Sequence, residues 1–265
     1  LGLAGASAAT ILAQCISVLY LVLHIKRKVP ELHLNRKLLV YDTQEIRTHA
    51  RLSIPMGFQS SIIAIGSITL QVALNTMGTN AVATQAIVSK IDQIAMLPMM
   101  SIGLAMATFG AQNYGAKQYR RINQGLFQSL LIAVSWAIGF AILLVSLNYY
   151  FTTAFISPSQ TAVIDMARHY YIVNGGFYWL LAILFVTRST LQGLGNARIP
   201  TICGVAELVM RAAVAIIGVN LLNYTVIISS NPAAWLGSTA ILIPTTIRMV
   251  RRFNRENAQE KIVLN

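Results

Sequence analysis

Acidic residues are scarce in this sequence. It has 8 Asp and Glu against 20 Lys and Arg, which gives a net charge of +12, yet residues of either sign make up only 11% of the chain. Soluble domains carry roughly one quarter charged residues, so a soluble domain is excluded. A nucleic-acid-binding protein concentrates its cations on a soluble face. Here they form short clusters beside apolar stretches, so no nucleic acid partner is expected.

Cysteine and histidine are also rare, with 2 and 4 copies. Cys15 and Cys203 both lie inside apolar stretches, which argues against a disulfide and indicates ordinary packing. The sequence has no Cys or His spacing typical of a metal site. No histidine lies deep in an apolar stretch, so an intramembrane enzyme lacks a base. We therefore predict no catalytic residue, no metal and no cofactor.

Long apolar stretches dominate the sequence, which is 55% hydrophobic. A helix that crosses a bilayer core of about 30 Å needs about 20 mostly apolar residues. Seven stretches meet or approach this length, the last being the weakest. They predict an all-α integral membrane protein, a polytopic bundle of about seven transmembrane helices. The stretches are 3–24, 53–75, 81–109, 123–147, 161–187, 199–222 and 232–248.

The cations predict an orientation. Of the 20 Lys and Arg, 17 lie in four segments, and the intervening gaps hold none. Basic gaps face the cytoplasm, which puts the N-terminus of this chain outside and its C-terminus inside, in the bacterial plasma membrane with anionic lipids as partners. The basic segments are 26–51, 117–121, 188–198 and 248–261; the uncharged gaps are 76–80, 148–160 and 223–231.

The stretches also predict how the chain is divided. A first transmembrane helix at 1–24 precedes a cytoplasmic linker at 25–51, which is either a helix on the membrane surface or a solvated loop. A six-helix bundle at 52–250 and a cytoplasmic tail at 251–265 follow. Because the chain begins inside an apolar stretch without Met, we expect it to be a fragment.

Several amides lie within the predicted spans. Polar groups in hydrocarbon must be paired or wetted, so these amides either join helices or line an aqueous cavity. The number of Gln side chains favours the cavity. At helical spacing Gln71 and Asn75 share one face, and Gln85 and Gln93 share another. With Gln59, these are the predicted polar contacts to a substrate.

Asp92, Glu207 and Arg211 are the ionisable residues within the predicted spans that bear on function. Asp92 is near the middle of its span, where an unpaired carboxylate costs several kcal/mol. It either carries a proton or pairs with a cation on another helix, and its neighbourhood on the helix does not decide between the two. Glu207 and Arg211 are four residues apart on one helix, and we predict that they form a structural ion pair.

Proline and methionine mark the 81–109 span. Pro98 removes a backbone hydrogen bond and predicts a bend, which is either static or a moving hinge. Met96 belongs to a group of methionines in the same half of the span. Methionine accepts varied apolar ligands but also fills cores, so Met96 is a candidate substrate contact.

Two motifs resemble the MATE family (multidrug and toxic compound extrusion). Residues 107–121 (ATFGAQNYGAKQYRR) are similar to the family's helix-to-loop signature. Residues 191–200 (LQGLGNARIP), with Glu207 and Arg211 after them, resemble its Gln-Gly-x-Gly loop and Glu-x-x-x-Arg helix. Ile54-Pro55 and Trp235 agree as well. The likeness extends over about residues 1–255.

The resemblance implies an exporter of two six-helix lobes around a central cavity. This chain would supply the last helix of the first lobe and the whole second lobe, with the missing N-terminal lobe as its partner. A proton or Na⁺ gradient would drive antiport of amphipathic or cationic drugs, and Asp92 would neutralise the substrate or exchange a proton. Some members carry acidic residues where Gln59 and Leu181 stand here, which weakens a sodium site of that type.

Two alternatives remain. A flippase for lipid-linked precursors, from the same superfamily, would need several deep cations for a diphosphate, and only Lys90 and Arg211 are expected to lie deep. A structural membrane bundle that transports nothing would not need Gln59, Gln71, Asp92 and Gln93 at membrane depth. Secondary active transport therefore ranks first.

Overall fold

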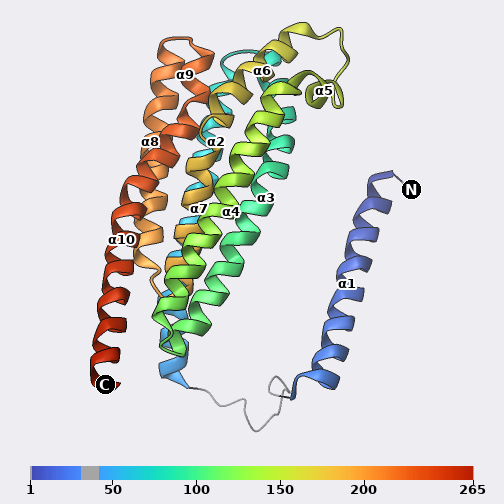
Figure 1. Ribbon diagram of the computed structural model, residues 1–265. Coiled ribbons are helices and arrows are strands. Elements are labelled where there is room, and N and C mark those ends of the chain that lie inside the picture. Colours follow the sequence, from blue (N-terminus) through green and yellow to red (C-terminus); the bar gives the residue numbers. More distant parts are fainter. Residues whose placement is uncertain (1, 31–41, 265) are drawn as a thin grey trace. The chain divides into compact units, whose positions relative to one another are not determined.

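The computed structural model describes residues 2–30 and 42–264. Every regular element within these residues is a helix (Figure 1), so the predicted all-α class is confirmed. The helices are α1 (Gly2–Lys28), α2 (Thr43–Asn75), α3 (Thr79–Gly115), α4 (Tyr119–Ser146), α5 (Asn148–Thr153), α6 (Thr161–Gly175), α7 (Tyr178–Gly193), α8 (Arg198–Asn220), α9 (Tyr224–Ile228) and α10 (Ser230–Leu264).

Six segments in the described ranges are long and apolar enough to cross a membrane, and the helix pair α6 and α7 supplies a seventh if it is one span. The two helices of that pair are bent by 50°. The predicted stretch 161–187 contained this break without revealing it. Gly175 and Gly176 stand at the break, where the lack of a Cβ weakens the preference for a continuous helix.

The chain divides into two compact units, residues 1–48 and 49–265. The first unit contains α1, whose last turn carries Lys26, Arg27 and Lys28, a favourable place for cations because the helix dipole is negative there. Both described ends of the predicted 25–51 linker are helical, because α1 continues to Lys28 and α2 begins at Thr43. The rest of that linker, 31–41, lies outside the described residues.

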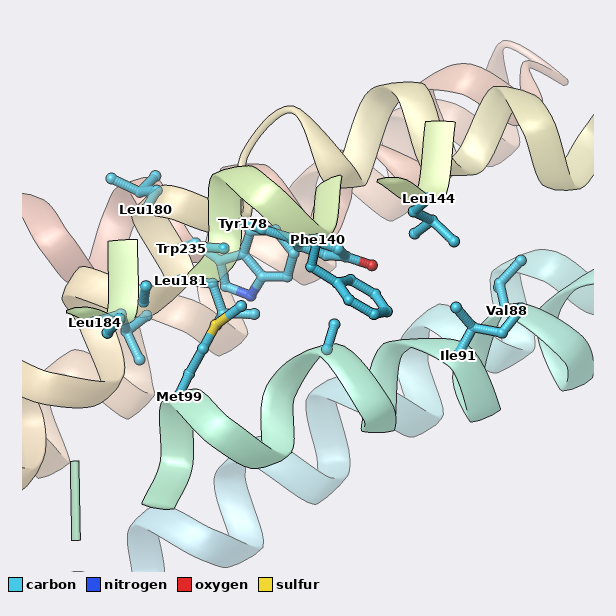
Figure 2. Packing of buried hydrophobic residues seen from close by; sticks show 14 of the residues in the cluster. Val88, Ile91, Met99, Phe140, Leu144, Tyr178, Leu180, Leu181, Leu184 and Trp235 are labelled. Carbon is cyan, nitrogen blue, oxygen red and sulfur yellow. The ribbon is translucent and has the colours of Figure 1, made fainter. Parts of the chain in front are cut away.

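The core of the second unit forms around α7, against which α3, α4 and α10 all pack. Figure 2 shows Tyr178 and Leu181 of α7 beside Trp235 of α10 and Met99 of α3; all four side chains are buried. Large apolar side chains such as Leu104 remain exposed on the outer helix faces. This distribution suits a bundle surrounded by lipid, where outward apolar surface carries no penalty.

The two ends of the second unit differ in charge. Helices α5 and α9 and the first turn of α6 lie at one end, and the last turns of α10 lie at the other (Figure 1). The gaps 148–160 and 223–231 at the first end carry no Lys or Arg, whereas the turn after α3 and the end of α10 carry clusters of them. The charge alternation read from the sequence is therefore a separation in space.

Candidate functional site

A cavity of about 340 Å³ lies inside the second unit, bounded by α2, α3, α6, α7, α8 and α10. It brings together residues that are up to 172 positions apart along the chain, from Ile63 to Trp235. Six of the predicted site residues line it: Gln71, Gln85, Asp92, Met96, Glu207 and Arg211.

Helix α3 contributes one stripe of the cavity wall. Gln85, Ser89, Asp92 and Met96 all line it, and their spacing of four, three and four residues keeps them on one helix face. Gln85 Nε2 donates to Ser89 Oγ at 3.0 Å, and its Oε1 is buried without a partner among the described residues. Gln93 is exposed instead, because it lies one position further round the helix, and it does not line this cavity.

Asp92 is buried and accepts two hydrogen bonds from tyrosine hydroxyls. The Tyr170 hydroxyl donates to Oδ2 at 2.5 Å, and the Tyr178 hydroxyl donates to Oδ1. Tyr170 lies on α6 and Tyr178 on α7, so the carboxylate is held from both sides of the helix break. No ion pair of Asp92 occurs within the described residues. Sequence reasoning missed both tyrosines, because they read as members of an apolar stretch.

Glu207 pairs with Arg188 rather than with Arg211. The predicted Glu207–Arg211 ion pair is therefore wrong. The guanidinium that reaches the carboxylate of α8 comes from α7, and spacing along one helix cannot reveal a partner on another helix. Arg188 also donates to Ser238 Oγ of α10 at 3.1 Å. It was assigned to a cytoplasmic cluster, but α7 continues to Gly193 and Arg188 is only 7% exposed.

Arg211 lines the same cavity and is 6% exposed. Its Nε is buried without a hydrogen-bond partner, and the ion pairs found among the described residues do not include it. The side chain passes close to Gly66 of α2, where a Cβ would lie 2.9 Å from Arg211 Nη1. Glycine at that position leaves room for the guanidinium.

The α2 amides have different surroundings. Gln71 lines the cavity and its Nε2 donates to Asn75 Oδ1 at 3.1 Å, on the shared face that was predicted. Asn75 itself is exposed and does not line this cavity. Gln59 is buried outside the lining, and its Oε1 accepts from Gln192 Nε2 of α7 at 2.9 Å. This hydrogen bond joins two helices, which is the alternative to lining a cavity that the sequence left open for these amides.

Pro98 lies inside α3, which continues through it. Proline leaves the carbonyl of the residue four positions earlier, Ile94, without its helical donor. Next to it, Trp136 Nε1 of α4 donates to the Ala95 carbonyl at 3.0 Å. A side chain from a neighbouring helix therefore holds the backbone at this point, and a moving hinge at Pro98 stays a prediction.

The geometry defines a helical membrane protein with a cavity bounded by its spans and lined by both polar and apolar side chains. A family model for MatE matches residues 55–217, and the chain belongs to this family, as the two motifs predicted. It is 24% identical over 245 residues to the probable multidrug resistance protein YpnP of Bacillus subtilis (strain 168), covering 91% of this chain and 50% of YpnP. The probable multidrug resistance protein YoeA of the same organism is 22% identical over 210 residues, 77% of this chain and 44% of YoeA.

Solved structures share the fold. A mutant of the Vibrio cholerae MATE transporter VcmN is similar with a TM-score of 0.84 and 15% identity, over 96% of this chain and 57% of that one. A MOP superfamily transporter from Pyrococcus furiosus is similar with a TM-score of 0.66 and 15% identity, over 74% and 43%. The chain spans half or less of the length of the two Bacillus relatives.

Proposed function

We propose that this chain acts within a secondary active transporter in which H⁺ or Na⁺ exchange drives export of amphipathic or cationic compounds across the bacterial plasma membrane. Its membership of the MatE family supports this, as do the two relatives named as probable multidrug resistance proteins. The rest of the exporter, including the N-terminal lobe, would complete the route through the membrane.

The observation that carries the proposal is the position of Asp92 in the cavity, held by one hydroxyl from each side of the α6–α7 break. An ionised carboxylate only accepts hydrogen bonds, whereas a protonated one also donates. A proton or a cationic group at Asp92 would weaken these two bonds, because a hydrogen bond to a neutral or neutralised carboxyl is weaker than one to a free carboxylate. Binding at the cavity would bias the bend between α6 and α7, which is the differential contact that alternating access requires.

The remaining lining suits the apolar part of such a compound. Met96, Leu181, Phe185 and Trp235 line the cavity together with the polar groups. Ligand sites commonly combine a mostly apolar wall with a few polar groups that fix orientation, and methionine adapts to varied shapes. The cavity would thus select for one charged group and tolerate variation in the rest of the molecule.

Replacing Asp92 tests the proposal. In the complete protein reconstituted in liposomes, Asp92→Asn should lower gradient-driven transport of a fluorescent cation at least about tenfold, because a charge-assisted contact is worth roughly 1.5–3 kcal/mol. Imposing the proton and Na⁺ gradients separately identifies the coupling ion.

Asp165→Asn is the matched control, since Asp165 is an exposed carboxylate on α6. It should transport like the unmodified protein. Unchanged transport by Asp92→Asn would remove this residue from the mechanism, and loss of transport in both variants would show that the effect is not specific to the cavity.

One observation bears on the flippase alternative. Lys90, expected from the sequence to lie deep, is exposed over the Phe155 ring and does not line the cavity. Arg188 lines the cavity with Arg211, but its ion pair with Glu207 offsets its charge. A diphosphate would therefore meet one uncompensated arginine in the lining rather than several. Transport of a fluorescent lipid by the same liposomes, with no transport of the soluble cation, would favour the flippase.

A further inference from the structure

The cavity lining contains four charged side chains, Asp92, Arg188, Glu207 and Arg211. Their partners differ. Arg188 and Glu207 form an ion pair, and Asp92 is satisfied by two tyrosine hydroxyls. Arg211 has neither a hydrogen bond nor an ion pair that accounts for its charge within the described residues.

A buried guanidinium without a partner is costly, because its charge has left water and gained nothing in return. Arg211 is more than nine-tenths buried and borders the cavity. Arg188 Nε, also in this lining, is a second buried donor without a partner. The missing acceptor would therefore have to come from the space that the cavity encloses or from an acidic residue outside this chain.

We infer that Arg211 is the centre of an anion subsite that binds the carboxylate of a small amphipathic ligand. A guanidinium presents a planar fork of N–H donors that matches the two oxygens of a carboxylate. Together with Asp92 on α3, this gives the cavity one site for a cationic group and a separate one for an anionic group. The cavity then accepts zwitterions, which extends the proposed function and rests on it only for the role of Asp92.

A pair of dyes isolates the subsite. A rhodamine with a free carboxylate and the methyl ester of the same rhodamine share the cationic ring system and differ only in the anionic group. Their dissociation constants are measured by calorimetry on the complete purified protein in an uncharged detergent without added anionic lipid, so that lipid phosphate does not compete.

The unmodified protein should bind the acid more tightly than the ester. Arg211→Gln should reduce that preference at least about tenfold, chiefly by weakening the acid. Arg211→Lys keeps the charge but loses the fork, and should retain part of the preference. Arg198→Gln is the matched control, because Arg198 is exposed at the start of the same helix, and it should leave the preference unchanged.

The ratio of the two constants is insensitive to the fraction of protein that is folded, so a destabilised variant still gives a reading. An unchanged ratio of the two dissociation constants in Arg211→Gln would overturn the inference, whether both affinities stay the same or both weaken equally. Equal weakening is expected if an acid elsewhere in the complete protein pairs with Arg211. The test uses no gradient. An anion subsite could thus be found even if Asp92→Asn left transport intact, which separates its failure from that of the proposed function.

Discussion

At the scale of single residues, Gly193 sets how closely α7 approaches α3. A Cβ built at Gly193 would lie 2.3 Å from the Ala107 carbonyl oxygen, a backbone atom that no rotamer change can move aside. This contact lies between the two sequence motifs of the family, since Ala107 begins one and Gly193 belongs to the other. The packing of α7 against α3 also carries Tyr178 to Asp92.

Gly193→Ala should therefore lower the thermal stability of the complete protein in detergent by about 1–3 kcal/mol, the usual cost of overpacking. Intrinsic fluorescence during heating measures the change. Gly139→Ala on α4 is the control, because nothing lies within 4 Å of a Cβ there. It should have little effect or stabilise the helix by up to about 1 kcal/mol. Equal melting temperatures for both variants would show that the close contact at Gly193 does not determine the stability of the protein.

The residues that could be predicted from sequence are those whose neighbours lie on their own helix. Asp92, Gln85 and Met96 were each predicted as site residues, and all three line the cavity. Of the predicted pair Gln85 and Gln93, only Gln85 lines it, because the lining face of α3 passes through Asp92 and leaves Gln93 exposed. The partners of Asp92 could not be predicted, because Tyr170 and Tyr178 come from helices packed against α3. The ion pair was predicted wrongly for the same reason, since Arg188 crosses from α7 to Glu207.

At the scale of elements, Asp92 of α3 holds the break between α6 and α7 through hydrogen bonds to both helices. Tyr170 stands five residues before the end of α6, and Tyr178 is the first residue of α7. Both hydroxyls bind the same carboxylate on α3. The break is thus fixed by side-chain contacts as well as by the glycines, which explains why composition alone predicted one continuous span.

Removing both hydroxyls should loosen the break. In the variant Tyr170→Phe with Tyr178→Phe, the amides at 174–178 should exchange with deuterium at least about tenfold faster, because each lost bond to a charged group costs roughly 1.5–3 kcal/mol. Mass spectrometry of the peptides covering the break measures this. Tyr171→Phe changes the adjacent tyrosine, whose hydroxyl meets Thr152, and should leave exchange as it was. Faster exchange in that control as well would indicate general destabilisation.

At the scale of the whole molecule, charge and helix count argue for one threading of the second unit. The number of spans and the all-helical class followed from length and hydropathy, which act locally. The order and direction of the helices in the structure agree with the sequence prediction, because short gaps force neighbouring helices to run antiparallel. The cavity did not follow, since it depends on which polar stripes face one another across six helices.

Cysteine labelling of the complete protein tests the orientation. After Cys15→Ser, which removes the exposed native thiol, an impermeant maleimide applied to intact cells should label Ser159→Cys. It should label Lys117→Cys only after permeabilisation, because basic turns stay in the cytoplasm. Ser159 lies in the uncharged gap before α6, and Lys117 lies in the turn between α3 and α4. Labelling of both positions from the same side would contradict the threading.

The length of α6 turns a small rotation near Asp92 into a larger displacement at the far end of the helix. Its 15 residues make an arm about 22 Å long, at 1.5 Å of rise per residue. If α6 pivoted rigidly at the glycines by about 10°, its far tip at Thr161 would sweep about 4 Å. One proton delivered to a single carboxylate could thus be amplified into a displacement wide enough to open or shut a passage for a small molecule.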